Sequence, residues 1–234
     1  MKKLESEKTL KLAKKIKAIN YLGGECKKCG EKNIFKLTFH HKDPNEKEFE
    51  YGEYRDRRWS FLESELDKCE LLCQNCHREF HYNQGPLKFG NSRRIDKAIY
   101  LEYSGGRCIK CGYNKCPSSL TFHHRDPKEK KFWIGGLNER VDSVVDLDDR
   151  IKEEIDKCDL LCANCHTIEH SDIEFFEKNK DRILNKVEIY KEKQNKIDRC
   201  LVFEMYKNGN RQSEIAKYFK ASKGTISDII RLGE

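Results

Sequence analysis

The sequence is poor in the features that mark membrane and secreted proteins. Its 234 residues contain no apolar run long enough to span a bilayer, and its N-terminus is lysine-rich and polar, without the apolar core of a signal peptide. Apolar residues make up only 37% of the chain, and charged residues make up another 37%. We therefore expect an intracellular protein with small hydrophobic cores, which need additional stabilisation by cross-links or metal ions.

Histidine is absent outside one pattern that occurs twice. The first copy is Cys26-x2-Cys29, then Phe39-His40-His41-x-Asp43-Pro44, then Cys73-x2-Cys76-His77-x3-His81. The second copy is Cys108-x2-Cys111, then Phe122-His123-His124-x-Asp126-Pro127, then Cys162-x2-Cys165-His166-x3-His170. The two copies contain all eight histidines and eight of the twelve cysteines. A register repeated in this way indicates two copies of one metal-dependent unit.

The paired cysteines predict two structural zinc ions. Thiols stay reduced inside cells, and two Cys-x2-Cys knuckles complete a tetrahedral thiolate shell with no open position. The predicted ligands are Cys26, Cys29, Cys73 and Cys76 in the first copy, and Cys108, Cys111, Cys162 and Cys165 in the second. Two such zinc sites reduce the formal charge from +7 to about +3. Cys69 and Cys158 are either substitute ligands or small buried side chains, and Cys116 and Cys200 are expected in cores.

The histidines indicate a second, open kind of metal site. Neighbouring residues on a strand point to opposite faces, so one histidine of each adjacent pair can bind a metal while the other faces a substrate. Two or three imidazoles leave coordination positions for water and phosphate oxygens. A neutral histidine beside them has a pKa suited to activating water. The alternative is that the histidines are extra zinc ligands or buried polar residues of a binding module.

The predicted fold class is α+β, with two small zinc-stapled modules followed by an all-α tail. The predicted domains are 1–92 (a basic helix and the first module), 93–171 (the second module), 172–195 (a charged connecting helix) and 196–234 (the tail). Strands are expected before each double histidine, and helices on both sides of each second knuckle. Glycine pairs at 23–24 and 105–106 precede each first knuckle and end the helices before them.

The last 39 residues resemble a helix-turn-helix. Gln212, Ala216 and Ile226 stand at positions of that motif, and residues 222–231 would be the recognition helix. Lys220 stands where the family usually has a turn glycine, and a plain helical hairpin is the alternative. The resemblance implies DNA contacts from Lys223, Thr225, Ser227 and Arg231.

Both copies of the histidine pattern resemble the HNH, or ββα-metal, nuclease family, over residues 20–82 and 102–171. The resemblance implies that His40 and His123 bind a catalytic Mg²⁺ or Mn²⁺, and that His77 and His166 are the second ligands. It implies that His41 and His124 are general bases, and that His81 and His170 are further ligands or phosphate contacts.

One position departs from the family. Lys68 and Lys157 replace the asparagine that usually orients the base, so a backbone carbonyl or Asn75 could take that role.

The two copies differ around the site. The first has Arg78 and an Arg55-Asp56-Arg57-Arg58-Trp59 cluster, which suit phosphate contacts by Arg55, Arg57, Arg58 and Arg78. The second has Thr167 and the milder Lys130-Lys131-Phe132-Trp133, so the second site is expected to be the weaker one. A solvated charged surface is the alternative reading of either cluster.

The resemblance implies a metal-dependent endonuclease on double-stranded DNA, of homing or phage type, in the cytoplasm of a bacterial or phage-infected cell. A monomer with two sites would act as a pseudo-dimer, with a homodimer as the alternative. A structure-selective or defence nuclease is the nearest alternative function. A non-catalytic zinc-containing DNA-binding regulator is the alternative from another class.

Overall fold

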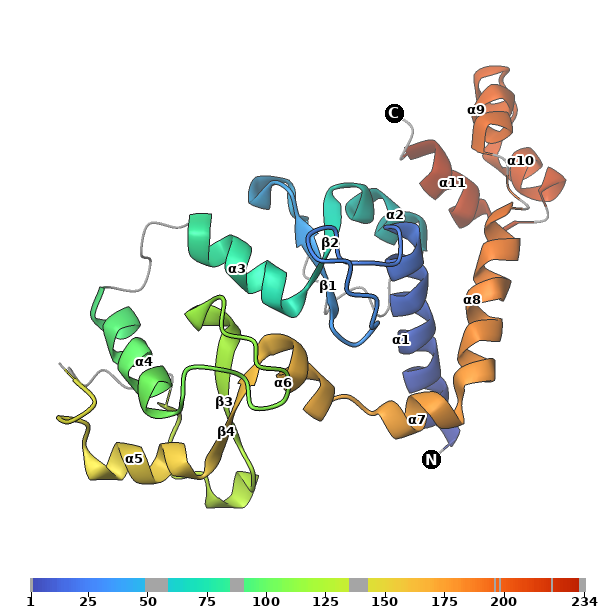
Figure 1. Cartoon of the computed structure of the whole chain (residues 1–234). Helices are drawn as coiled ribbons and strands as arrows, with labels where there is room; N and C mark the ends of the chain where they lie inside the picture. Colours follow the sequence, from blue (N-terminus) through green and yellow to red (C-terminus); the bar gives the residue numbers. More distant parts are fainter. Residues whose placement is uncertain are drawn as a thin grey trace. The chain divides into compact units, whose positions relative to one another are not determined.

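The structure, a computed structural model, describes residues 2–48, 59–84, 91–134, 143–195, 197, 199–219 and 221–231 (Figure 1). Within these ranges, the side chains at 2–3, 60–61, 83–84, 91–96, 189–195 and 200 are not described. Three predicted DNA contacts, Arg55, Arg57 and Arg58, lie outside the described residues, as does the turn position Lys220. No helix of the described part is both long and apolar enough to cross a membrane.

The chain is α+β, with two β-hairpins and a helical C-terminal region. In the first hairpin, β1 (Leu37–His41) pairs with β2 (Cys69–Cys73). In the second, β3 (Leu120–His124) runs antiparallel to β4 (Cys158–Cys162). The strands before each double histidine are thereby confirmed. The second strand of each hairpin was not expected, since the sequence indicated only a helix leading into the second knuckle.

A helix precedes and another follows the second strand of each hairpin, as the sequence predicts. Helices α2 (Trp59–Asp67) and α5 (Asp149–Asp156) precede β2 and β4, and α3 (Gln74–Gln84) and α6 (Ala163–Glu169) follow them. Short 3-10 turns, η1 (Pro44–Glu46) and η4 (Pro127–Glu129), follow the double histidines, and the Asp-Pro of the motif starts each turn. Each aspartate side chain accepts a backbone N–H two residues on, which fixes the chain as it leaves the strand.

The chain divides into two compact units that are interleaved in sequence. The first contains residues 1–24, 39–71 and 172–234, and the second contains 25–38 and 72–171. The division passes through the first hairpin. The predicted domain limits describe the sequence repeat, and they stay a prediction.

In the first unit, helix α1 (Lys2–Tyr21) lies along α8 (Lys180–Asn195) (Figure 1). Ile16 and Ile19 of α1 and Ile183 and Val187 of α8 are buried. The single connecting helix predicted for 172–195 is wrong in one respect. A short helix α7 (Ile173–Lys178) ends at Asn179, whose N–H and side-chain amide both bond to the carbonyl of Phe175.

The tail consists of α9 (Arg199–Lys207), α10 (Gln212–Tyr218) and α11 (Lys223–Arg231), which belong to the first unit. These helices share one core, so the tail is more than a helical hairpin. The core contains Val202, Ile215, Ala216, Ile226, Ile229 and Ile230. Arg199 forms an ion pair with Glu63 of α2.

The second unit contains helix α4 (Asn91–Tyr103) and a short 3-10 turn, η3 (Pro117–Ser119), in addition to the second hairpin. Ile99 and Tyr100 of α4 pack with Ile151 and Ile155 of α5. Leu120 of β3 packs with the β4 leucines in an adjoining cluster that includes Cys108 and Cys162. The core therefore joins the strands to the knuckle cysteines and holds the second repeat's candidate site in place.

Candidate functional site

Each hairpin lies beside four cysteines that can hold a metal ion. In the second copy these are Cys108, Cys111, Cys162 and Cys165, and their sulfur atoms all lie within 4.8 Å of one another. The Sγ atoms of Cys111 and Cys162 are 3.6 Å apart. A tetrahedral zinc with Zn–S bonds of about 2.3 Å requires sulfur atoms roughly 3.8 Å apart. The spacing therefore suits a tetrahedral zinc site.

The first copy has the same geometry. The sulfur atoms of Cys26, Cys29, Cys73 and Cys76 also lie within 4.8 Å, with those of Cys29 and Cys73 at 3.6 Å. The thiols of Cys69 and Cys158 instead donate hydrogen bonds to the carbonyls of Glu65 and Glu154. They are therefore packing residues, like buried Cys116, and do not belong to the four-cysteine groups. The side chain of Cys200 is outside the described set.

The electrostatics of these groups also suit a dication. Burial raises the pKa of the Cys108 thiol, but hydrogen bonds with the backbone of Cys162, Cys111 and Lys110 outweigh burial and lower this pKa to about 7. Burial, followed by the neighbouring thiols, raises the pKa of Cys165 far above its ordinary value. The four sulfurs cannot all ionise against one another without a compensating cation, which zinc would supply.

Three histidines of the second copy form a separate group. His123 of β3, His166 of α6 and His170 at the end of α6 each offer a ring nitrogen, and these nitrogens lie within 4.8 Å of one another. The His166 and His170 rings are 4.6 Å apart, with their Nε2 atoms at 3.3 Å. His123 lies 5.2 Å and 5.1 Å from those rings. The structure thus groups His170 with the two predicted ligands, and the choice between a ligand role and a phosphate contact stays a prediction.

Two members of this group, His123 and His166, resist protonation. Burial is the main cause, and the charges of His170, His123 and Arg78 add to it, so that the pKa of His166 falls to about 4. Burial and His170 also lower the pKa of His123. Neutral imidazoles offer lone pairs at neutral pH, so the group is prepared for a cation that accepts nitrogen ligands.

The second histidine of the pair lies on the opposite face of β3, next to a buried carboxylate. His124 Nε2 is 2.9 Å from Glu154 Oε1, and Glu154 is fully buried. The same oxygen accepts the N–H groups of Lys131 and Phe132, and the other oxygen accepts Lys157 Nζ at 2.9 Å. Burial raises the pKa of Glu154, but the bonds from Lys157 and His124 and the two N–H groups lower it to about 2.

This carboxylate decides which nitrogen of His124 can act as a base. Because ionised Glu154 can only accept hydrogen bonds, Nε2 must carry the proton and Nδ1 the free lone pair. About a tenth of the His124 side chain is exposed, so the ring is held firmly but is not sealed. A base with this orientation can take a proton at Nδ1.

The sequence interpretation missed the orienting carboxylate. It left a backbone carbonyl or Asn75 as candidates, and the structure gives Glu154 instead. A signal was present, because the pentapeptides at 65–69 and 154–158 share a Glu-x-Asp-Lys-Cys pattern.

The first copy of the pattern contains the same histidine–carboxylate and histidine–histidine contacts as the second, the former in the first unit and the latter in the second unit. In the first unit, His41 Nε2 is 2.8 Å from buried Glu65, which also accepts Lys68 Nζ. In the second unit, the His77 and His81 rings are 4.6 Å apart, with their Nε2 atoms at 3.3 Å, as in the second copy. His40 is a buried residue of β1, and its predicted metal role beside His77 stays a prediction.

Asn75 and Asn164 connect the two repeats inside the second unit. The N–H of Asn75 donates to Asn164 Oδ1 at 3.1 Å, and the N–H of Asn164 donates to Asn75 Oδ1 at 3.0 Å. Equivalent atoms of the two knuckles thus bond reciprocally, as residues do across a two-fold axis. We name this pair the asparagine clasp. It gives the second-knuckle asparagines a role in joining the repeats.

The residues predicted to contact DNA differ in their exposure and in their hydrogen-bond partners. Arg78 donates to Thr121 and Ser118 of the second repeat. Lys223 and Arg231 are exposed on α11, while Thr225 and Ser227 are half-buried. The N–H of Thr225 donates to Ser222 Oγ, which caps the helix. Contact with DNA stays a prediction for all of these residues.

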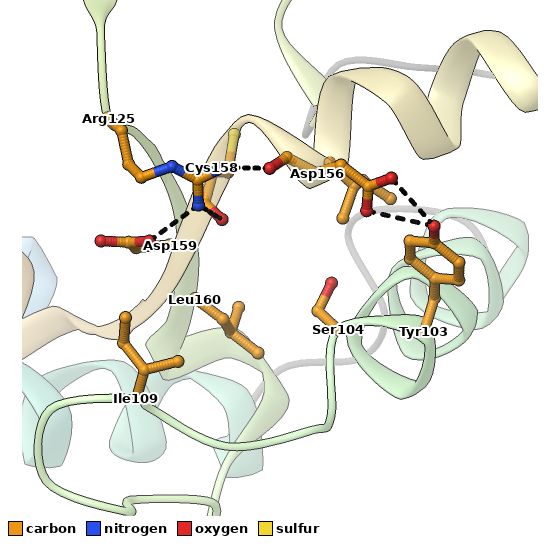
Figure 2. Close-up of a pocket in the computed structure, with 9 residues that line it drawn as sticks. Tyr103, Ser104, Ile109, Arg125, Asp156, Cys158, Asp159 and Leu160 are labelled. Carbon is orange, nitrogen blue, oxygen red and sulfur yellow. Dashed lines mark hydrogen bonds and ion pairs between the residues drawn. The ribbon is translucent and has the colours of Figure 1, made fainter.

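An open pocket lies on another part of the second unit (Figure 2). It is lined by Tyr103, Ser104, Ile109, Arg125, Ile155, Asp156, Cys158, Asp159 and Leu160. Arg125 donates to Asp159 and to the Cys158 carbonyl, and the Tyr103 hydroxyl donates to Asp156. Its charged groups are therefore paired with one another, and no histidine of the second copy lines it.

No family of known proteins, no curated protein and no solved structure matches this chain. The chain has two ββα-like modules, each beside a cysteine group that can hold zinc, and the second module also carries three histidines that can hold a metal ion.

Proposed function

We propose that the chain is a metal-dependent HNH-type endonuclease that hydrolyses phosphodiester bonds of double-stranded DNA. One observation carries the proposal: β3 presents two different histidine environments on its two faces. His123 joins His166 and His170 in a group fit for a metal, while His124 is held by buried Glu154. A purely structural zinc module needs neither, because its four cysteines already complete a closed shell.

The residues support the following roles. His123, His166 and His170 would hold a divalent ion, which when bound supplies Lewis-acid polarisation of the phosphate and stabilises the leaving oxygen. His124 Nδ1 would take a proton from the attacking water. Glu154 keeps the ring in the required tautomer and stabilises the imidazolium that forms.

The same roles are proposed for the first copy on the strength of the repeat. His41 and Glu65 match His124 and Glu154 in distance, and His77 and His81 match His166 and His170. His40 would complete the first metal site by its equivalence to His123.

The ligand chemistry refines the choice of metal. Three imidazoles suit zinc, iron, cobalt or nickel better than Mg²⁺, which prefers oxygen ligands. We therefore favour a transition-metal ion over Mg²⁺ as the catalytic metal, and use Mn²⁺ in the tests below.

The tail would select the DNA site. Lys223 and Arg231 are exposed at the two ends of α11, where a recognition helix would meet DNA. Selection by a dedicated tail suits a homing-type or phage-encoded nuclease, and a structure-selective or defence nuclease is the alternative. The asparagine clasp supports a monomer acting as a pseudo-dimer, with one site per strand, over a homodimer.

The test is cleavage of supercoiled plasmid by the zinc-loaded chain with Mn²⁺ or Mg²⁺. We expect linear product from the wild type, nicked circles from His41→Ala or His124→Ala, and no product from the double variant. Loss with His41→Ala alone would mean that the second site is inactive. No cleavage of plasmid or branched DNA by folded wild type would reject the endonuclease and favour the DNA-binding regulator.

A further inference from the structure

Arg78 follows His77 on α3 of the first repeat, but its side chain reaches the second repeat. Its Nη1 atom donates to Thr121 Oγ1 at 2.9 Å and lies 3.4 Å from the Ser118 carbonyl. Ser118 Oγ in turn donates to the Arg78 carbonyl at 3.5 Å. The guanidinium is therefore fixed against the start of β3.

The position of Thr121 places this guanidinium near the histidine group. Thr121 and His123 are alternate residues of β3, so their side chains leave the same face of the strand. Two residues along a strand span roughly 7 Å. The cation from the first repeat thus lies on the strand face that carries the second repeat's candidate metal ligands.

Among the residues that the structure describes, Arg78 has no carboxylate partner, and burial lowers the pKa of its guanidinium although the nearby Cys116 and Cys162 thiols raise it. Both of its hydrogen-bond acceptors are neutral oxygens, and its side chain is partly buried. A second cation is nearby, because burial, with a contribution from Arg78, lowers the pKa of Lys97 to about 8. Buried charges are normally paired with an opposite charge, so a partly buried guanidinium that contacts only neutral oxygens suits an anion.

We propose that Arg78 completes the second site from the first repeat by binding an oxygen of the phosphate held beside His123, His166 and His170. This inference rests on the proposed function and deepens it, since it makes the second site dependent on the first repeat. The relation is not mutual. Thr167, which occupies the place of Arg78 in the second repeat, bonds to Ala163 of its own helix at 2.8 Å.

The test measures metal and phosphate binding separately and needs no cleavage. The full zinc-loaded chain carries His40→Ala and His81→Ala, which leave the second histidine group as the intact candidate site. Free Mn²⁺ is followed by electron paramagnetic resonance. Binding of inorganic phosphate is followed by the broadening of its phosphorus resonance by bound Mn²⁺. Arg78→Met and Arg78→Lys are compared with Thr167→Val, the matched position of the other repeat.

We expect Arg78→Met to weaken phosphate binding at least tenfold and to change Mn²⁺ affinity less than twofold. Arg78→Lys keeps the charge but loses the planar fork, so we expect about a threefold loss. Thr167→Val should change neither affinity. Melting temperature and zinc content show which variants are folded. If Arg78→Met does not fold, the test is decided by Arg78→Lys.

Two results would overturn the inference while leaving the proposed function intact. One is phosphate binding that does not depend on Arg78. The other is a parallel loss of Mn²⁺ and phosphate affinity, which would mean that Arg78 only supports the fold. A parent chain that binds no Mn²⁺ would remove the metal site itself, and the proposed function with it.

Discussion

At the scale of single residues, Glu65 and Glu154 set the chemistry of the histidines beside them. Each is buried, and each holds the Nε2 atom of its histidine within 2.9 Å. The low pKa of Glu154 makes it a permanent acceptor above pH 5. The proton balance of the candidate base therefore depends on a residue outside the double-histidine motif.

Replacing Glu154 with glutamine tests this dependence through stability. The pKa of Glu154 is lowered from 4.5 to about 2, so the folded state gains stability that is fully present above pH 4.5. This gain is lost as the pH falls from 4.5 toward 2, and it amounts to about 3 kcal/mol at neutral pH. We expect urea unfolding at pH 7 to show that much destabilisation in Glu154→Gln, shrinking in acid.

Glu153→Gln is the control, because Glu153 is exposed and its ion pair within the described part of the chain is a 3.5 Å contact with Lys131. Comparing the two variants cancels the acid sensitivity that the zinc thiolates give to every form of the chain. A Glu154→Gln chain as stable as Glu153→Gln at pH 7 would contradict the assigned charge state.

At the scale of elements, the features set by residue spacing along the chain could be predicted. The contacts between residues far apart in the sequence, which only the fold brings together, could not. The cysteine knuckles, the strands before the double histidines and the helices after the second knuckles followed from residue spacing. The role of Glu154 could not be predicted, because the chain has 40 acidic residues and only the fold brings this one to His124. Arg78 was predicted as a phosphate contact of the first repeat, but its hydrogen bond to Thr121 of the second repeat, 43 residues away, could not be predicted for the same reason.

The asparagine clasp is an element-scale feature with a direct readout. Asn164→Ala removes the acceptor of the Asn75 N–H, so that amide should exchange its hydrogen about fivefold faster, consistent with a net bond of about 1 kcal/mol. Asn164→Asp keeps an acceptor oxygen and should preserve protection. Hydrogen exchange measured by NMR gives the comparison.

Asn33→Ala is the matched control, because the Asn33 side chain accepts the nearby N–H of Phe35, away from the asparagine clasp. It should leave the Asn75 amide unchanged. Equal Asn75 exchange in the wild type and Asn164→Ala would show that the reciprocal bonds do not join the repeats in solution.

At the scale of the whole molecule, the two cysteine groups are unevenly distributed. Both lie in the second compact unit, while the core of α9, α10 and α11 lies in the first. Thiolate metal sites contribute folding energy directly, because an unfolded chain lacks the preformed site. The stability of the two units should therefore respond differently to zinc.

We expect complete chelation of zinc to unfold the second unit and to leave amide protection in α9, α10 and α11. Circular dichroism and hydrogen exchange would follow the two units. Cys165→Ala should bind one zinc ion in place of two, whereas Cys158→Ala, outside the four-cysteine group, should bind two. An unchanged melting transition after full zinc removal would refute the structural role of the metal.

Arg78 and Thr167 occupy equivalent positions of the two repeats but are different residues. This difference has a consequence for how the two repeats can evolve. In a dimer of identical chains every mutation appears in both halves, so an arginine on one side forces an arginine on the other. Here the halves are encoded separately, although Asn75 and Asn164 still meet as equals. Each half can therefore change alone, so the nuclease that we propose would have no reason to prefer palindromic DNA.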